Sequence, residues 1–164
     1  MKNSRKLKIG LDYHGVIDNN INYFSVFCRK AKRRGHDIYV ITGGPKVSVS
    51  QKLKAINMPY DMCFAISDYY IALHKIEQNS KGKVVIPDNL WNMAKADFCR
   101  RSKINIHIDD SVKYINWFST PYCYYNKNTN KGYISPGIEF DFNQSADIVL
   151  DKIEKMISKL TCFV

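Results

Sequence analysis

The stretch Lys8-Ile9-Gly10-Leu11-Asp12-Tyr13-His14-Gly15-Val16-Ile17-Asp18 decides how the rest of the chain is interpreted. Apolar residues alternate with others over Leu7–Leu11, as in a β-strand, which then meets an acid, Asp12, and a turn residue, Gly15. In open α/β sheets ligands bind outside the carboxyl ends of the strands, so a carboxylate here is a candidate for chemistry. The alternative, equally good on this stretch alone, is that Asp12 caps a turn to which Gly15 gives backbone freedom.

The composition is that of a globular chain with an excess of positive charge. The 164 residues are 45% hydrophobic and 24% charged, which suits one domain with a core of its own. Lys and Arg number 25 against 15 Asp and Glu, so the formal net charge is +10. This charge favours anionic partners such as nucleotides or nucleic acid without choosing between them, and simple solubility is the alternative explanation.

Neither the apolar segments nor the cysteines indicate an exported or membrane-bound protein. No apolar run approaches the roughly 20 residues that span a bilayer, and the basic N-terminus is not followed by a signal-peptide pattern. The five cysteines are widely spaced and include no Cys-x-x-Cys pair, which argues against a disulfide framework and a zinc site. We therefore expect a cytoplasmic protein with buried free thiols and no membrane partner.

Strand and helix patterns alternate along the chain. Further strands are expected over Ile38–Ile41, Asp61–Ile66, Val84–Ile86, Ile104–Asp110 and Tyr122–Tyr125. Helices are expected over 20–34, Val47–Asn57, Ser67–Gln78, Asp88–Lys103, Ser111–Phe118 and Ser145–Leu160, and 126–143 is expected to be a loop. This alternation predicts one α/β domain, residues 1–164, around a parallel sheet.

Polar side chains stand at the carboxyl ends of three of these strands. They are Asp12, Thr42, and the pair Asp109 and Asp110, while Lys95 lies on the helix before the last of them. All strand carboxyl ends lie at one edge of a parallel sheet, so we expect these residues to converge although they are far apart in sequence.

Phosphoryl transfer is the chemistry that such a set could perform. A carboxylate can attack phosphorus and form an aspartyl-phosphate, which splits one difficult displacement into two easier ones. Further carboxylates can hold Mg²⁺, which prefers oxygen ligands and often retains substrate phosphate in its shell. A hydroxyl and an ammonium group can bind the remaining phosphoryl oxygens, where negative charge must be held during transfer.

In their order these residues resemble the four motifs of the haloacid dehalogenase superfamily of Mg²⁺-dependent phosphohydrolases. The first motif, Asp-x-Asp-Gly, is matched by Asp12-Tyr13-His14-Gly15, and the second, a Ser or Thr ending the second strand, by Thr42 before Gly43. The third motif, a lysine, is matched by Lys95, and the fourth, an acidic pair after an apolar strand, by Asp109-Asp110. The resemblance covers nearly the whole chain, and the ordered set is far more specific than any one motif.

The resemblance implies both a fold and a metal site. The fold would be a three-layer, Rossmann-like sandwich around a mostly parallel five-stranded sheet. Asp12 would be the nucleophile and a Mg²⁺ ligand, and the backbone carbonyl of His14 would be another ligand. Asp109, helped by Asp110, would complete the site.

The resemblance also implies a phosphate-binding group made of Thr42, Gly43 and Lys95. Lys95 would in addition restrain the charge of the nucleophile. The alternative is that Lys95 is a solvated helix residue, in which case Lys83 and Lys103 are weaker substitutes for the third motif.

His14 departs from the family pattern. The family's phosphatases carry a second Asp at this position, which protonates the leaving oxygen and then activates water. Histidine can also do acid–base work, so His14 is a working substitute, a sign of a changed reaction, or a sign that the site binds phosphate without turnover. His107 alternates with isoleucines inside its strand, and we interpret it as structural.

Room for an insertion over the site exists only between Thr42 and Lys95. Residues 67–89 are predicted to form a small flap or cap there. Its aromatic and basic residues could stack on a base and pair with phosphate, or could be local core, the two being equally good interpretations. They are Tyr69, Tyr70, His74, Lys75, Lys81, Lys83 and, at the border, Trp91.

We therefore expect a Mg²⁺-dependent phosphohydrolase that acts on a phosphate monoester, with a nucleotide or a nucleic-acid end as candidate substrates. The alternative is a protein that binds a nucleotide or another phosphorylated ligand with little or no catalysis, and His14 separates the two. A nucleic-acid-binding module rests only on the net charge and is the weakest interpretation.

Overall fold

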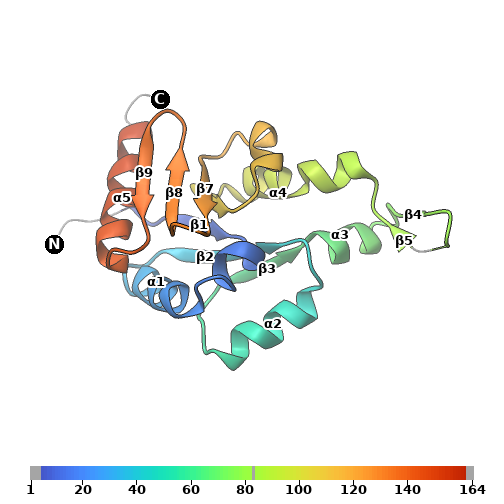
Figure 1. The fold of residues 1–164 in the computed structure, drawn as a ribbon, viewed down its shortest axis with the longest axis horizontal. Coiled ribbons are helices and arrows are strands. Elements are labelled where there is room, and N and C mark those ends of the chain that lie inside the picture. Colours follow the sequence, from blue (N-terminus) through green and yellow to red (C-terminus); the bar gives the residue numbers. More distant parts are fainter. Residues whose placement is uncertain (1–4, 83, 162–164) are drawn as a thin grey trace.

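One sheet forms the centre of the structure, a computed structural model that describes residues 5–82 and 84–161. Within these residues the sheet has seven strands, which are β1 (Lys8–Leu11), β2 (Asp37–Thr42), β3 (Met62–Ala65), β6 (Ile106–Asp109), β7 (Tyr122–Asn126), β8 (Lys131–Ile134) and β9 (Ile138–Asp141). Their order is β3-β2-β1-β6-β7-β8-β9 (Figure 1). The first five in this order are parallel, and β8 and β9 are antiparallel additions at one edge. The predicted α/β fold with a mostly parallel sheet is therefore confirmed.

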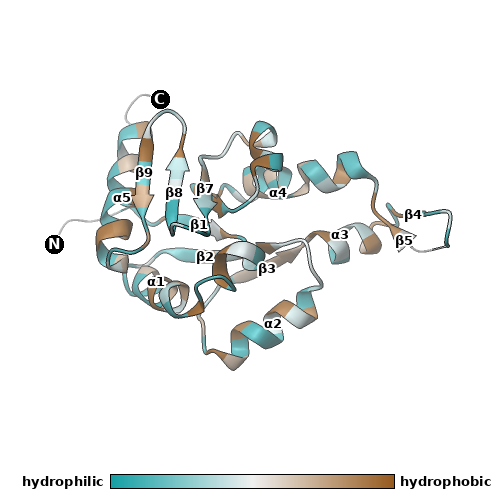
Figure 2. Ribbon diagram, viewed as in Figure 1, coloured by the Kyte–Doolittle hydropathy of each residue, from teal (hydrophilic) through white to brown (hydrophobic). Residues whose placement is uncertain are grey.

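The described residues form five α-helices, of which the first four lie between parallel strands and the fifth follows β9. They are α1 (Ile21–Arg33), α2 (Lys46–Ala55), α3 (Ile66–Ala72), α4 (Asp88–Ser102) and α5 (Ala146–Thr161). α1 begins as predicted, because the side chain of Asn20 accepts a hydrogen bond from the backbone N–H of Tyr23. Figure 2 shows hydrophilic and hydrophobic residues alternating along α2 and α5, as expected for helices with one buried side.

Alternate side chains of β2 enter two separate hydrophobic clusters. Ile38 and Val40 belong to the larger cluster, which also contains side chains of α1, α2 and α5. Ile41 belongs to a smaller cluster with side chains of α3 and α4, and Tyr39 packs against it. Successive side chains of a strand point to opposite faces of the sheet, so both faces are covered here. Because both faces are buried, the sequences of the parallel strands are continuous apolar runs.

The loop predicted over 126–143 is wrong, because β8 and β9 lie within it and extend the predicted five-stranded sheet. Each of these strands has only four residues, set among Asn, Lys and Gly, so a period of two hardly shows in the sequence. The hairpin of β8 and β9 is stabilised by packing against the rest of the protein. Phe140 is fully buried, and a Cβ at Gly132 would lie 2.5 Å from the Sγ of Cys123, so β8 needs glycine to approach β7.

The segment between β3 and α4 projects from the sheet as an arm (Figure 1). The helix predicted over Ser67–Gln78 is shorter than expected, since α3 ends at Ala72. The strand predicted over Val84–Ile86 does not join the main sheet. It forms β5 (Val84–Val85), which pairs antiparallel with β4 (Glu77–Gln78) in a separate two-stranded ribbon.

Four of the cysteines are buried free thiols, as predicted, and they are Cys28, Cys63, Cys99 and Cys123. Cys162 lies outside the described residues.

In residues 5–82 and 84–161, no helix has both the length and the apolar character needed to cross a membrane. The cytoplasmic location stays a prediction.

Candidate functional site

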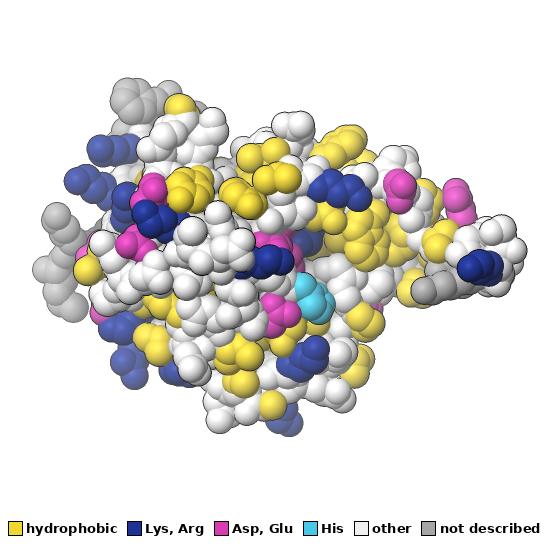
Figure 3. Space-filling model, viewed as in Figure 1, with side chains coloured by type: hydrophobic (Ala, Val, Ile, Leu, Met, Phe, Trp, Pro, Cys, Tyr) yellow, Lys and Arg dark blue, Asp and Glu magenta, His cyan; other side chains and the backbone are white. Residues whose placement is uncertain are grey.

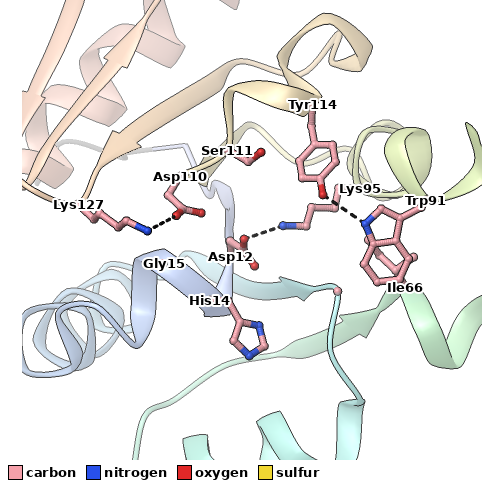
Figure 4. Close-up of a pocket in the computed structure, with 11 residues that line it drawn as sticks. Asp12, His14, Gly15, Ile66, Trp91, Lys95, Asp110, Ser111, Tyr114 and Lys127 are labelled. Atoms are coloured by element: carbon pink, nitrogen blue, oxygen red, sulfur yellow. Dashed lines mark hydrogen bonds and ion pairs between the residues drawn. The ribbon is translucent and has the colours of Figure 1, made fainter. Parts of the chain in front are cut away.

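The carboxyl ends of three strands meet at one place. Asp12 follows β1, Thr42 ends β2 and Asp109 ends β6, and β1 lies between β2 and β6 in the sheet. Figure 3 shows acidic, basic and histidine side chains together near the middle of the face on view. A cavity of about 340 Å³ opens at this place, with Asp12, His14 and Lys95 among its lining residues (Figure 4).

Lys95 lies between two carboxylates. Its Nζ is 2.7 Å from Oδ2 of Asp12 and 2.6 Å from Oδ2 of Asp109. The three side chains are almost completely removed from solvent, with exposed fractions of 5%, 8% and 0% in the order Lys95, Asp12, Asp109. Lys95 is therefore not a solvated helix residue. Lys103 is exposed at the end of α4, and Lys83 lies outside the described residues.

Three carboxylates surround a space that suits a cation. One oxygen from each of Asp12, Asp109 and Asp110 lies within 4.8 Å of the others. In the part of the chain that the structure describes, Oδ1 of Asp12 is buried and has no hydrogen-bond partner. Lys95 supplies one positive charge near three acidic groups. A hard divalent cation such as Mg²⁺, which takes carboxylate oxygens, fits this donor set.

The acidic groups differ in their tendency to ionise. Burial raises the pKa of Asp12 to about 7, despite the opposing influence of Lys95. Burial also works against the charge of Asp109, but Lys95 and His107 together hold the pKa of that carboxyl below its usual range. In the absence of a bound cation, Asp109 is therefore the carboxylate that balances Lys95, and Asp12 titrates near neutral pH.

His107 supports Asp109 from within β6. The ring is fully buried, and its Nε2 lies 3.1 Å from Oδ2 of Asp109. Burial lowers the pKa of His107, so the neutral ring donates from Nε2 to the carboxylate. Its other contacts are close: the ring stacks on Phe118, and a Cβ at Gly10 would lie 2.8 Å from Nδ1. His107 is thus a structural residue, as interpreted from the sequence, and its hydrogen bond orients Asp109.

The turn after β1 is shaped by glycine. Gly15 has a φ of +82°, a conformation that side chains rarely adopt, and a Cβ there would overlap the carboxylate of Asp110. The backbone N–H of Gly15 also donates to Oδ1 of Asp18 at 2.7 Å. Gly15 therefore gives more than flexibility, because it lets the first and fourth motifs come into contact.

His14 points away from the Lys95 ion pair. In Figure 4 the ring lies below Asp12, whereas Lys95 approaches Asp12 from the right. The ring is exposed, and its Nδ1 lies 3.3 Å from the hydroxyl of Thr42. A Cβ at Gly44 would lie 3.0 Å from its Cε1, so the loop after β2 also makes room for this ring.

Thr42 lies beneath the cavity rather than in its wall. Its side chain is fully buried, and its Oγ1 accepts a hydrogen bond of 3.2 Å from the backbone N–H of Gly44. Gly43 is the residue of this loop that lines the cavity. The hydroxyl of Thr42 therefore holds the loop in shape, while the loop itself faces the space that a ligand would fill.

Sequence reasoning missed several residues of the cavity wall. Lys127, from the turn between β7 and β8, has its Nζ 3.6 Å from Oδ2 of Asp110. Ser111 and Tyr114 reach the cavity from the residues after β6, where Val112–Trp117 forms a short 3-10 helix. No spacing or motif marks Lys127 or Tyr114, since only the folded chain brings them beside the strand ends.

Among the described aromatic and basic residues predicted for the flap, only Trp91 lines the cavity. Tyr70 is buried and donates to the carbonyl of Leu90 at 3.1 Å, and Tyr69 accepts a hydrogen bond from Arg101 at 3.0 Å. The tyrosines therefore pack against α4 as local core. The other described members of that group, His74, Lys75 and Lys81, are exposed on the arm.

The cavity is thus lined by Asp12, Lys95 and Asp110 of the first, third and fourth motifs and by Gly43, whereas Thr42 and Asp109 are buried and do not line it. No protein-family model matches the chain, and no curated protein sequence matches it significantly.

Proposed function

We propose that the protein is a Mg²⁺-dependent phosphohydrolase that cleaves a phosphate monoester through an aspartyl-phosphate on Asp12. The surroundings of the two Asp12 oxygens carry this proposal. Oδ2 is held by Lys95, Oδ1 is buried and has no hydrogen-bond partner among the described residues, and Asp12 contributes one oxygen to the carboxylate triad. One carboxylate oxygen is thereby fixed while the other stays available.

The proposed family is the haloacid dehalogenase superfamily, and the proposed fold is its three-layer sandwich. The motifs in Asp12-Tyr13-His14-Gly15, Thr42, Lys95 and Asp109-Asp110 support this assignment by their order. Their proximity in the folded chain adds support, because Asp12, Lys95 and Asp110 line one cavity and Lys95 contacts both Asp12 and Asp109.

In the proposed reaction, a carboxylate oxygen of Asp12 forms a bond to phosphorus as the bond from phosphorus to the leaving oxygen breaks. Lys95 orients the nucleophile and favours its ionised form, against burial and the nearby Asp109 and Asp110, which raise the pKa of Asp12. Bound Mg²⁺, held by the triad and the backbone carbonyl of His14, would supply positive charge for the phosphoryl oxygens. Water then attacks the phosphorus, which releases phosphate and returns Asp12 to its carboxylate form.

The leaving oxygen needs a proton, and water later needs a base. His14 is the residue at the motif position that serves both needs in the family, and its exposed ring can exchange protons with solvent. Its contact with Thr42 and its direction away from Lys95 also favour a second candidate function. In that function the cavity binds a phosphorylated ligand and turns it over slowly or not at all.

The decisive experiment is phosphate release from p-nitrophenyl phosphate by the wild type, with Mg²⁺ and with EDTA. Asp12→Asn should abolish Mg²⁺-dependent release. Asp97→Asn, at a carboxylate of α4 that pairs with Arg100 at 3.1 Å, is the matched control. Trapping of phosphate on the wild-type protein but not on Asp12→Asn would identify the intermediate. Asp12→Asn activity within about tenfold of the wild type would rule out Asp12 as the nucleophile.

A further inference from the structure

The cavity has two chemically different walls. One wall carries the acidic residues Asp12 and Asp110, and the other is formed by Ile66, Trp91 and Tyr114 (Figure 4). In Figure 3 hydrophobic side chains border the charged group on the side that faces the projecting arm. Hydrolysis of phosphate alone needs only the charged wall, so the aromatic wall calls for a separate explanation.

The aromatic wall is held in place by polar contacts. Nε1 of Trp91 donates to the hydroxyl of Tyr114 at 3.3 Å, which links α4 to the 3-10 helix after β6. The Nζ of Lys95 lies 5.5 Å from the centre of the Tyr114 ring, within the range of a cation–π contact. The lysine that holds Asp12 therefore also contacts the aromatic wall.

The indole of Trp91 lies directly against the loop that follows β2. A Cβ at Gly43 would stand 2.8 Å from Cζ2 of Trp91, so this loop position accepts only glycine while the indole keeps its place. Gly43 is also the loop residue expected at the phosphate. A ring stacked on Trp91 would thus be attached close to a phosphate held by that loop.

We infer that the cavity selects phosphate monoesters whose leaving group carries a planar ring, with a nucleoside monophosphate as the fitting class. This inference rests on the proposed function. The base would stack on Trp91, as bases do on aromatic side chains, and the phosphate would face the carboxylate triad and its cation. A volume of about 340 Å³ lies at the lower end of the range for small-molecule sites, which suits one nucleotide rather than a polymer.

The test compares two substrates that share a phosphorylated ribose and differ in the base. They are adenosine 5′-monophosphate and ribose 5-phosphate, each with Mg²⁺. Trp91→Leu should lower kcat/KM for the nucleotide on the order of tenfold and leave that for ribose 5-phosphate within about twofold, since stacking is lost only where there is a base. Trp91→Phe, which retains a ring, should recover much of the difference.

The chain contains a matched control, because it has only two tryptophans. Trp117 is half exposed on the neighbouring 3-10 helix and does not line the cavity, so Trp117→Leu should change neither substrate's kcat/KM. Trp117→Phe leaves Trp91 as the single indole. Its fluorescence, followed in a stopped-flow instrument before turnover, should be quenched by the nucleotide and little changed by ribose 5-phosphate.

The outcomes separate this inference from the proposed function. Equal losses for both substrates in Trp91→Leu, with an unchanged thermal transition, would overturn the stacking role and leave the hydrolase intact. Quenching by the nucleotide without phosphate release from either substrate would support ring recognition and remove the hydrolase. Wild-type protein that hydrolyses both substrates equally well and shows no quenching would overturn the inference.

Discussion

Lys95 and Asp12 form an ion pair of 2.7 Å from which solvent is almost excluded. They come from α4 and from the end of β1, and the same ammonium lies 2.6 Å from Asp109 at the end of β6. Two charged groups are costly to bury unless they are paired, so removing one member leaves the other uncompensated. This relationship makes Lys95 important for stability as well as for the proposed chemistry.

Lys95→Met should lower the free energy of unfolding by about 3–5 kcal/mol, the usual cost of an uncompensated buried charge. Urea unfolding near pH 7 in EDTA measures this change. Lys103→Met, at an exposed lysine directly after α4, should cost little. Mg²⁺ should restore part of the lost stability in Lys95→Met, because a cation can neutralise the same carboxylates. A loss no larger than that of Lys103→Met would contradict the importance of the pair.

Millimolar Mg²⁺ should raise the melting temperature of the wild type, because a ligand that binds only the folded state stabilises it. Asp110→Asn should reduce this gain. It removes one carboxylate of the triad while leaving the ion pairs of Lys95 in place. Differential scanning calorimetry with and without Mg²⁺ measures both effects, with Asp97→Asn as the control. A wild-type melting temperature indifferent to Mg²⁺ would count against a metal site.

The metal-free protein should lose stability as the pH rises from 5 towards 7. Burial raises the pKa of Asp12 to about 7 in the folded protein, whereas the unfolded chain titrates near 4. Between these values the folded state binds more protons, so raising the pH favours unfolding. One pKa unit corresponds to about 1.4 kcal/mol, so Asp12 alone can lower the free energy of unfolding by about 2–3 kcal/mol over this interval.

Urea unfolding in EDTA at several pH values checks this slope. Asp12→Asn cannot titrate at this position, so its stability should depend less on pH over the same interval. With Mg²⁺ present the wild-type trend should reverse, since the cation competes with the proton for Asp12 and binds more tightly as the pH rises. Identical pH profiles for the wild type and Asp12→Asn in EDTA would show that the Asp12 pKa is not raised.

His14→Ala should retain Mg²⁺ and ligand binding, because the proposed metal contact at this position is the backbone carbonyl. If the ring is the acid–base group, turnover should fall on the order of 10²-fold or more. His14→Asp should restore the family pattern and keep turnover near or above that of the wild type. Steady-state phosphate release and ligand titration of the three proteins provide the measurements.

Two other results for His14 would change the interpretation. An inert wild type that becomes a phosphatase as His14→Asp would show that the histidine silences the site, which favours the ligand-binding function. Full activity of His14→Ala would mean that the side chain has no acid–base role. The contact with Thr42 would then be its main contribution to the loop after β2.

The parallel half of the fold could be predicted because its strands are buried on both faces. Residues such as Ile38 and Ile41 therefore form apolar runs that end sharply at a polar residue, and a capping Asn20 marks the helix between two of them. The hairpin of β8 and β9 could not be predicted in the same way. Its stability comes from contacts such as Gly132 against β7, which have no counterpart in local periodicity.

The same distinction applies to the site. Asp12, Thr42 and Asp109 could be expected to converge, since parallel strands place their carboxyl ends together. Trp91, Tyr114 and Lys127 come from a helix, a short helix and a hairpin turn, and their positions depend on how these elements pack. Trp91 could be named from the sequence as a candidate for stacking on a base, whereas the places of Tyr114 and Lys127 in the cavity wall follow only from the folded chain.

The adjacency of β1 and β6 has a consequence for the growing polypeptide. When synthesis has reached α3, β1 can pair with β2, but its other edge has no partner until β6 emerges. An unpaired strand edge invites association with other chains, and Asp12 at its end still lacks both Lys95 and Asp109. A ribosome-bound chain of this length therefore has an open strand edge and an incomplete carboxylate triad, and both conditions end together when β6 docks.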